Sequence, residues 1–156
     1  MTSRDQLFNQ QASALGYSFD GEIKIGGNYV PLLQEGKHIY ISGQIPRVGN
    51  DVVVTGAAGS DVTLLDAQKA AKISVMRALA LLKNHLGTLA AVKTVLRINV
   101  YVQSAATFTQ QSEVADGASE ILYAVFGKVG VHTRTSVGVF QLPKDATVEI
   151  DMIVTV

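Results

Sequence analysis

Three segments combine apolar runs with regularly spaced polar residues and are therefore predicted to be β-strands. They cover residues 91–102, about 135–140 and about 147–155. Successive side chains of a strand point to opposite faces, so alternation predicts one apolar and one mixed face for each strand. The odd positions of the first segment carry Lys93, Arg97, Asn99 and Tyr101.

A helical period predicts three helices. The first covers residues 4–15 and ends at Gly16, the second covers about 63–86 and ends at Gly87, and the third covers about 107–126. Gly commonly follows the last residue of a helix. The long second helix has one apolar stripe, formed by Leu64, Ala67, Ala71, Val75, Ala78 and Leu82.

The order of these elements predicts an α+β domain spanning residues 1–156. Repeated glycines and short apolar alternations between residues 21 and 45 predict two or three antiparallel strands. Residues 1–21 then form an N-terminal helical extension. Right-handed crossovers would place the second and third helices on one face of a mixed sheet. The sequence alone favours pairing of the last two strands as a hairpin, because only a short turn separates them.

The mixed face of this sheet is expected to contact other subunits. It would expose a set of large apolar side chains together, which are Tyr40, Val95, Tyr101, Phe140 and Ile153. An exposed apolar patch of that size usually marks an interface. A closed cyclic oligomer is the simplest assembly that covers such a face on every copy.

Composition narrows the function. The 156 residues have zero formal net charge, 47% hydrophobic residues and no Cys. The absence of Cys excludes thiolate catalysis, and the absence of a basic run argues against nucleic-acid binding. No apolar stretch is long enough for a membrane span, and no signal peptide is visible, so we expect a cytoplasmic protein. The three His residues show no metal-ligand spacing, and no metal site is predicted.

Two charged residues within the final strands are candidate functional groups. Arg134 precedes one strand and Glu149 lies inside the other. A guanidinium can bind a planar carboxylate through two parallel hydrogen bonds, and a carboxylate can activate water as a general base. The residues alone leave a second interpretation open, in which Arg134 and Glu149 form an interface ion pair.

Several motifs, in this order, resemble the Rid family, also called YjgF-like or endoribonuclease L-PSP. They are YISGQIP at 40–46, the helix LLDAQKAAKISVMRALALL, VLRINVYV, and TRTSVGVFQLPKDATVEID at 133–151. The resemblance covers roughly residues 22–156. The N-terminal helix and the GGNYVPLL stretch are similar to the longer branch of the family.

The resemblance implies a chorismate-mutase-like fold and a homotrimer with three clefts between subunits. It implies hydrolysis of enamine or imine intermediates to 2-keto acids and ammonia, without a metal or organic cofactor. It also implies that the segment at 92–102 separates the last two strands, in place of the hairpin.

The resemblance further suggests roles for individual residues. Arg134 would bind the substrate carboxylate, and Glu149 would be the acidic catalytic residue. The remaining predicted site residues would bind or surround a small carboxylate-bearing substrate, and they are Tyr29, Ser42, Gly43, Glu120 and Ser136.

Other functions remain open from the sequence. The same arginine could serve a non-catalytic binder of small carboxylates. A ribonuclease, suggested by one of the family's names, is disfavoured by the neutral charge and the lack of a catalytic His pair. A pericyclic mutase is conceivable from the fold alone, but a fold does not determine a function.

Overall fold

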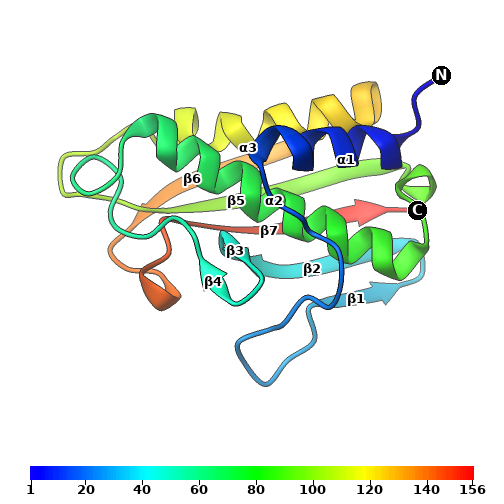
Figure 1. Ribbon diagram of the computed structural model, residues 1–156, viewed down its shortest axis with the longest axis horizontal. Helices are drawn as coiled ribbons and strands as arrows, with labels where there is room; N and C mark the ends of the chain where they lie inside the picture. Colours follow the sequence, from blue (N-terminus) through cyan, green and yellow to red (C-terminus); the bar gives the residue numbers. More distant parts are fainter.

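The computed structural model describes residues 1–156 as a mixed sheet covered by helices (Figure 1). The sheet has the strand order β1-β2-β7-β5-β6, in which β5 and β6 are parallel and the other neighbours are antiparallel. Its strands are β1 (Leu32–Glu35), β2 (His38–Gln44), β5 (Thr94–Gln103), β6 (Thr133–Val139) and β7 (Val148–Thr155). A separate two-stranded ribbon consists of β3 (Arg47–Val48) and β4 (Asp51–Val52). The predicted α+β fold class is confirmed.

The helices are α1 (Arg4–Leu15), α2 (Leu64–Leu86) and α3 (Gln111–Phe126). Short 3₁₀ turns follow at Leu89–Ala91, Gly127–Gly130 and Pro143–Asp145. The helices α2 and α3 pack against each other, with α2 over β2 and β7 and α3 over β5 and β6. None of the helices has both the length and the hydrophobicity that a membrane crossing needs.

The ends of α2 follow directly from its sequence. The Thr63 side chain accepts a hydrogen bond from the Asp66 backbone N–H at 3.1 Å, which is the standard way to cap a helix N-terminus. Gly87 ends the helix in the left-handed region, at φ 82°. The predicted boundaries of this helix are confirmed.

The predicted hairpin of the last two strands is wrong, and the arrangement implied by the family resemblance is found. Strand β5 lies between β6 and β7 and pairs with both. The apolar residues of β7 explain its central place, because Val148, Ile150, Met152 and Val154 are all buried. Burial of these four side chains under the helices stabilises the strand in this place.

Two local predictions also need correction. A bulge between Val95 and Arg97 reverses the alternation of β5, so Val95 is buried under the helices and does not join the mixed face. The third helix begins at Gln111, because residues 105–109 form a turn in which Phe108 packs against Gly59. The two or three antiparallel strands predicted between residues 21 and 45 are confirmed as two, β1 and β2, and residues 21–31 form a loop.

The N-terminal extension is part of the core. Phe8, Ala12 and Phe19 are buried in the same apolar cluster as the sheet and helices. The Asp5 carboxylate accepts hydrogen bonds from the Thr88 hydroxyl at 2.6 Å and from the Leu89 N–H at 2.9 Å. Partial burial raises the pKa of Asp5, but these two bonds and the nearby Lys83 charge together outweigh it, and the net effect lowers the pKa.

The open face of the sheet is only partly polar. Leu33, Tyr40 and Val137 have exposed fractions of 61%, 47% and 41%, and Phe140, just after β6, reaches 87%. Nothing within one chain covers these side chains. This face is therefore available for contacts with another molecule.

Candidate functional site

Glu149 lies on the open face of the sheet, beside Gly43. A bulge in β2 places Ser42 and Gly43 opposite a single residue of β7, Asp151. A Cβ atom added at Gly43 would lie 2.8 Å from the Glu149 carboxyl carbon. Glycine at this position thus leaves the space that the carboxylate occupies.

The environment of Glu149 makes it a better base than an ordinary glutamate. Burial raises the pKa of Glu149, and the neighbouring Asp151 carboxylate raises it further. Both effects penalise the ionised form. When ionised, a carboxylate with a raised pKa accepts a proton from water more readily.

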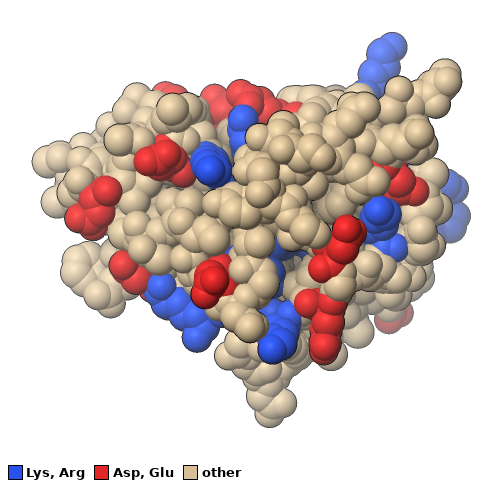
Figure 2. Space-filling view, viewed as in Figure 1, with Lys and Arg blue, Asp and Glu red and all other residues tan.

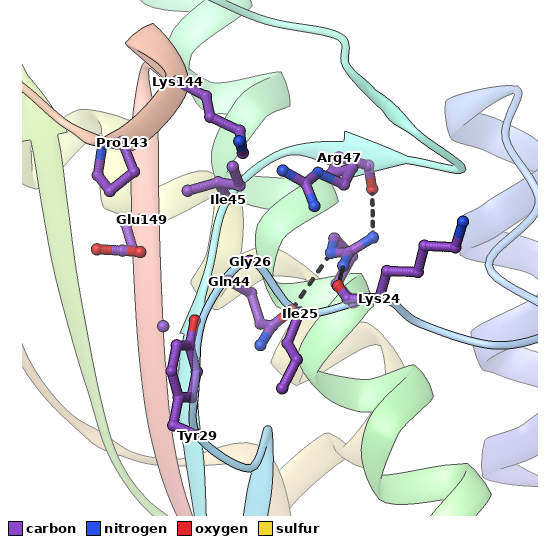
Figure 3. A pocket seen from close by; sticks show the side chains of 12 residues that line it. Lys24, Ile25, Gly26, Tyr29, Gln44, Ile45, Arg47, Pro143, Lys144 and Glu149 are labelled. Atoms are coloured by element: carbon purple, nitrogen blue, oxygen red, sulfur yellow. Dashed lines mark hydrogen bonds between the residues drawn. The ribbon is translucent and has the colours of Figure 1, made fainter.

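Glu149 forms one wall of a cavity of about 430 Å³, which we call the Glu149 cleft (Figure 3). Besides Glu149 of β7, four segments line it, and they are the loop at 24–29, the end of β2 with the start of β3, the turn at 143–144, and the middle of α2 at Arg77. In Figure 3 the Tyr29 hydroxyl points into the cleft from the side opposite Pro143. Tyr29, Gly43 and Glu149, three of the predicted site residues, are therefore brought together.

Arg77 joins three of these segments. It is only 6% exposed, in the middle of the apolar helix α2. Its guanidinium donates to the Gln44 side-chain oxygen at 3.3 Å, to the Arg47 carbonyl at 2.8 Å and to the Lys24 carbonyl at 3.3 Å. Burial and the nearby Arg47 lower the pKa of Arg77 to about 10. Buried charges are normally paired, so this arginine is unusual.

The turn at 143–145 presents Lys144 to the cleft. Lys144 and Asp145 both have positive φ angles, 59° and 58°, which non-glycine residues rarely adopt. Each such residue costs roughly 1–3 kcal/mol unless its surroundings enforce it. Gln103 enforces this turn, because its side chain accepts from the Leu142 N–H at 2.8 Å and donates to the Asp145 carboxylate at 2.7 Å.

Ser42 holds one of the segments that line the cleft through hydrogen bonds. Its hydroxyl donates to the Val30 carbonyl at 2.9 Å, and its N–H donates to the Pro31 carbonyl at 2.9 Å. These bonds fix the segment that carries Tyr29. Within one chain Ser42 therefore holds the loop, and its hydroxyl is already engaged.

Arg134 lies in a second group of polar side chains, which we call the Arg134 cluster. Nη1 donates to the Asp116 carboxylate and to the Ser119 hydroxyl, both at 2.9 Å. Nη2 donates to the Ser112 hydroxyl at 2.9 Å and to the Ser112 carbonyl at 3.3 Å. All four terminal N–H groups of the guanidinium are thus directed at α3 of the same chain.

His132 completes the Arg134 cluster. Its Nδ1 lies 2.7 Å from the Gly130 carbonyl oxygen, which can only accept, so in the neutral ring Nδ1 carries the proton. Nε2 then accepts from the Ser119 hydroxyl at 2.9 Å, and that hydroxyl in turn accepts from Arg134. Ser119 is only 8% exposed, so this chain of bonds orients Arg134 from inside the protein.

The sheet separates the two predicted catalytic residues within one chain. Paired residues of neighbouring strands point to the same face. Arg134 pairs with the buried Ile98 and therefore points toward the helices, whereas Glu149 pairs with Tyr101 on the open face. Ser136 follows Arg134 on the helix side of β6 and does not line the Glu149 cleft.

Glu120 lies in neither group within one chain. Its carboxylate pairs with Lys72 of α2 at 3.1 Å, and its side chain is 66% exposed. Successive residues of a helix point about 100° apart. Ser119, one residue earlier, therefore lies beside Arg134 and Glu120 does not.

The arrangement of the sheet, helices and cleft agrees with comparisons to known proteins. The profile of a family described as "YjgF/chorismate_mutase-like, putative endoribonuclease" matches residues 11–152. The chain belongs to this family. The resemblance first noted in the SGQIP and LPKD motifs is therefore confirmed.

Relatives of this family member include both sequences and solved structures. Protein TCP17 of Trypanosoma cruzi is 42% identical over 130 residues, which are 81% of this chain and 80% of TCP17. The crystal structure of protein Atu1372 from Agrobacterium tumefaciens is 35% identical with a TM-score of 0.87, covering 98% of this chain and 94% of that one. The structure of E. coli TdcF with bound serine shares the fold at a TM-score of 0.59 and 20% identity, over 85% and 91% of the two chains.

Sequence reasoning missed Arg47, Arg77, Lys144, Ser119 and His132 as parts of these two groups. Arg77 carried a usable signal, because it interrupts the apolar series VMRALALL in the middle of α2. His132 and Ser119 come from different elements and carried no such signal. Their proximity depends on how α3 packs against β6.

Proposed function

We propose that this protein hydrolyses enamine or imine forms of small 2-amino acids to 2-keto acids and ammonia. The observation that carries the proposal is the Glu149 carboxylate, half-buried in a cleft with a raised pKa. A group in that state is suited to take a proton from water. The bound serine in the TdcF structure supports a ligand of similar size.

We propose that the active site lies between the subunits of a homotrimer. Arg134 and Glu149 point to opposite faces of their own sheet, so one chain cannot direct both at one small molecule. In a ring of three, Arg134 of one copy can face the Glu149 cleft of the next. The exposed apolar side chains of the open face support such a contact.

The proposed reaction needs only water and proton transfers. An enamine first tautomerises to the imine by gaining a proton on carbon and losing one from nitrogen. Glu149 then takes a proton from a water molecule as the water oxygen bonds to the imine carbon. The π electrons of the C=N bond move to nitrogen, which gains a proton. The carbinolamine nitrogen then gains a second proton, loss of the O–H proton forms the C=O bond as the C–N bond breaks, and ammonia leaves.

In this scheme Arg134 binds the carboxylate of the substrate. Within one chain Arg134 pairs with Asp116, whose side chain is 56% exposed. Breaking such an exposed ion pair costs little free energy, because water can hydrate the released carboxylate. Ser119 and Ser112 would keep the guanidinium in place while the substrate carboxylate takes over the position of Asp116. An arginine held in advance loses less conformational entropy on binding.

A second candidate is a binder of small carboxylates that performs no reaction. The serine bound in the TdcF structure favours it, because holding such a small carboxylate requires no general base. We do not propose a ribonuclease. Figure 2 shows acidic and basic side chains interspersed over the face in view, without the continuous basic surface that binds phosphates.

The deciding experiment generates 2-imino acids enzymatically and measures the release of keto acid and ammonia. The proposal expects a rate clearly above that of buffer, and loss of the excess rate in Arg134→Ala. Saturable binding of 2-oxobutyrate without any acceleration would instead support the binder.

A further inference from the structure

The Glu149 cleft carries more positive charge than the binding of a ligand with a single carboxylate requires. Its lining includes four basic residues, Lys24, Arg47, Arg77 and Lys144, against one acidic residue, Glu149. The whole chain has zero formal net charge, so this is a local concentration. Charges of one sign that line a cleft attract ligands of the opposite sign.

These basic groups have no acidic partner in the protein. The two ion pairs of the structure are Lys72–Glu120 and Arg134–Asp116, both outside the cleft. Arg77 donates only to neutral oxygens, and Arg47 Nε is buried without any hydrogen-bond partner. A buried N–H of a charged group without an acceptor is rare and calls for a ligand or water.

Two of the cations converge on one end of the cleft. In Figure 3 the side chains of Arg47 and Lys144 extend from different elements toward Ile45, whereas the ammonium group of Lys24 points away. The Lys144 side chain lies close to Gly26, because a Cβ atom added at Gly26 would be 3.9 Å from the Cε atom of Lys144. The enforced left-handed turn at Lys144 holds this arrangement.

We propose that the ligand of this cleft carries two anionic groups, and that Arg47 and Lys144 bind the one distal to the reacting carbon. The ligand class is a 2-imino or 2-oxo acid with a terminal oxyanion, either a carboxylate or a phosphate. The assignment of the reacting end rests on the proposed function, but the distal site rests on the cation cluster alone. Arg77 is the positioning residue, because it binds the Arg47 backbone and keeps the ends of β2 and β3 together.

Calorimetry with matched ligands tests the distal site. 2-Oxoglutarate has a distal carboxylate, and a 2-oxo acid with a terminal phosphate has a distal phosphate. 2-Oxoglutaramate keeps the first carboxylate but ends in a neutral amide, so it is the isostere without a distal charge. We expect at least one of the two anionic ligands to bind about 10-fold tighter than the isostere, the scale of one charge-assisted contact. The preferred one identifies the oxyanion.

Single substitutions then show which residues cause the preference for a distal anionic group. Arg47→Met and Lys144→Met should each reduce it to below about 3-fold and lower the affinity for 2-oxobutyrate much less than the affinity for the dianion. Lys128→Met, which removes an exposed positive charge elsewhere, is the control and should change nothing. Equal affinity for all three ligands in the natural protein would overturn the proposal. An equal loss of 2-oxobutyrate and dianion binding in Arg47→Met would also overturn it, because Arg47 would then serve the reacting end.

Thermal melting gives a test that does not depend on the reaction. Arg47 and Arg77 repel each other in the empty cleft, so Arg47→Met should raise the melting temperature of the ligand-free protein. Glutarate or inorganic phosphate should stabilise the natural protein more than chloride does at equal ionic strength, and Arg47→Met should lose that gain. A lower melting temperature in Arg47→Met, with an unchanged anion effect, would show that Arg47 is structural and end the proposal. Failure of imine hydrolysis alone would leave both results standing.

Discussion

The Arg134 cluster and the Glu149 cleft represent opposite ways of placing charge in one small protein. Around Arg134, every terminal N–H has an acceptor and the positive charge meets the Asp116 carboxylate. In the cleft, Glu149 has a raised pKa, Arg77 has a lowered one, and Arg47 Nε has no acceptor. The polar groups of the Arg134 cluster all have hydrogen-bond or charge partners within the chain, whereas those of the Glu149 cleft do not.

The difference indicates where a ligand contributes most. Unfavourable charges persist in proteins mainly where function needs them, because removing them would usually increase stability. The cleft has the features of a site completed by a ligand. The Arg134 cluster has those of a prepared group that can be presented to a neighbouring subunit. The predictions below test this distinction.

The largest effect is expected at Glu149. Glu149→Gln keeps the shape of the side chain but removes the base, so imine turnover should fall by about 100-fold or more. The affinity for 2-oxobutyrate, measured by calorimetry, should hold or increase because a negative charge has left the cleft. Glu120→Gln is the matched control and should retain full turnover, since Glu120 pairs with Lys72 outside the cleft. Full activity in Glu149→Gln would exclude it as the base.

Mixing two inactive variants tests whether the regions meet across subunits. Arg134→Ala and Glu149→Gln should each be nearly inactive alone. Unfolded together in equal amounts and refolded, they should recover about a quarter of the natural activity, because a quarter of the sites in a random ring combine an intact Arg134 with an intact Glu149. Sedimentation should show trimers. A stable monomer, or no recovery of activity, would refute the shared site.

Arg134→Lys separates charge from geometry in the Arg134 cluster. Lysine keeps the positive charge but loses the planar fork, which binds a carboxylate through two parallel bonds. A lost charge-assisted bond costs roughly 1.5–3 kcal/mol, so the affinity for 2-oxobutyrate should fall by about 10-fold or more while the oligomer remains folded. Arg97→Lys, on the open face, is the control. Unchanged affinity in Arg134→Lys would make Arg134 purely structural.

A substitution at Asp116 is expected to have a smaller effect on the affinity for 2-oxobutyrate, and to increase it. If the substrate carboxylate replaces Asp116, then Asp116→Asn removes a competitor and should tighten 2-oxobutyrate binding by up to about 5-fold, the range of an exposed ion pair. Glu113→Gln, an exposed acidic residue near the start of the same helix, should have no such effect. Weaker binding in Asp116→Asn would mean that Asp116 orients Arg134 for the ligand.

The smallest effect is a pH dependence of stability. The folded protein binds the Glu149 proton more tightly than the unfolded chain, because burial and Asp151 raise its pKa. The resulting stabilisation is complete below the unfolded pKa of about 4.3 and is lost as the pH rises through the higher folded value. Glu149→Gln should therefore melt like the natural protein at low pH and at a higher temperature at pH 8. A lower melting temperature at pH 8 would indicate an ion pair across the interface.

The sequence by itself determined the elements and their class. Periodic apolar residues and the cap residues Thr63 and Gly87 defined α2, because these signals act within a few residues of the chain. The family resemblance added the central position of β7, which local alternation could not supply. A hairpin and a separated pair have the same local sequence pattern.

Only the tertiary structure decided which charges meet. Ser119 faces Arg134 and Glu120 does not, because one step along α3 turns a side chain away from β6. Arg47, Arg77 and Lys144 come from three elements that share a cleft only after α2 packs on the sheet. Such proximity depends on long-range packing, and the pKa of Glu149 depends on the burial that packing creates.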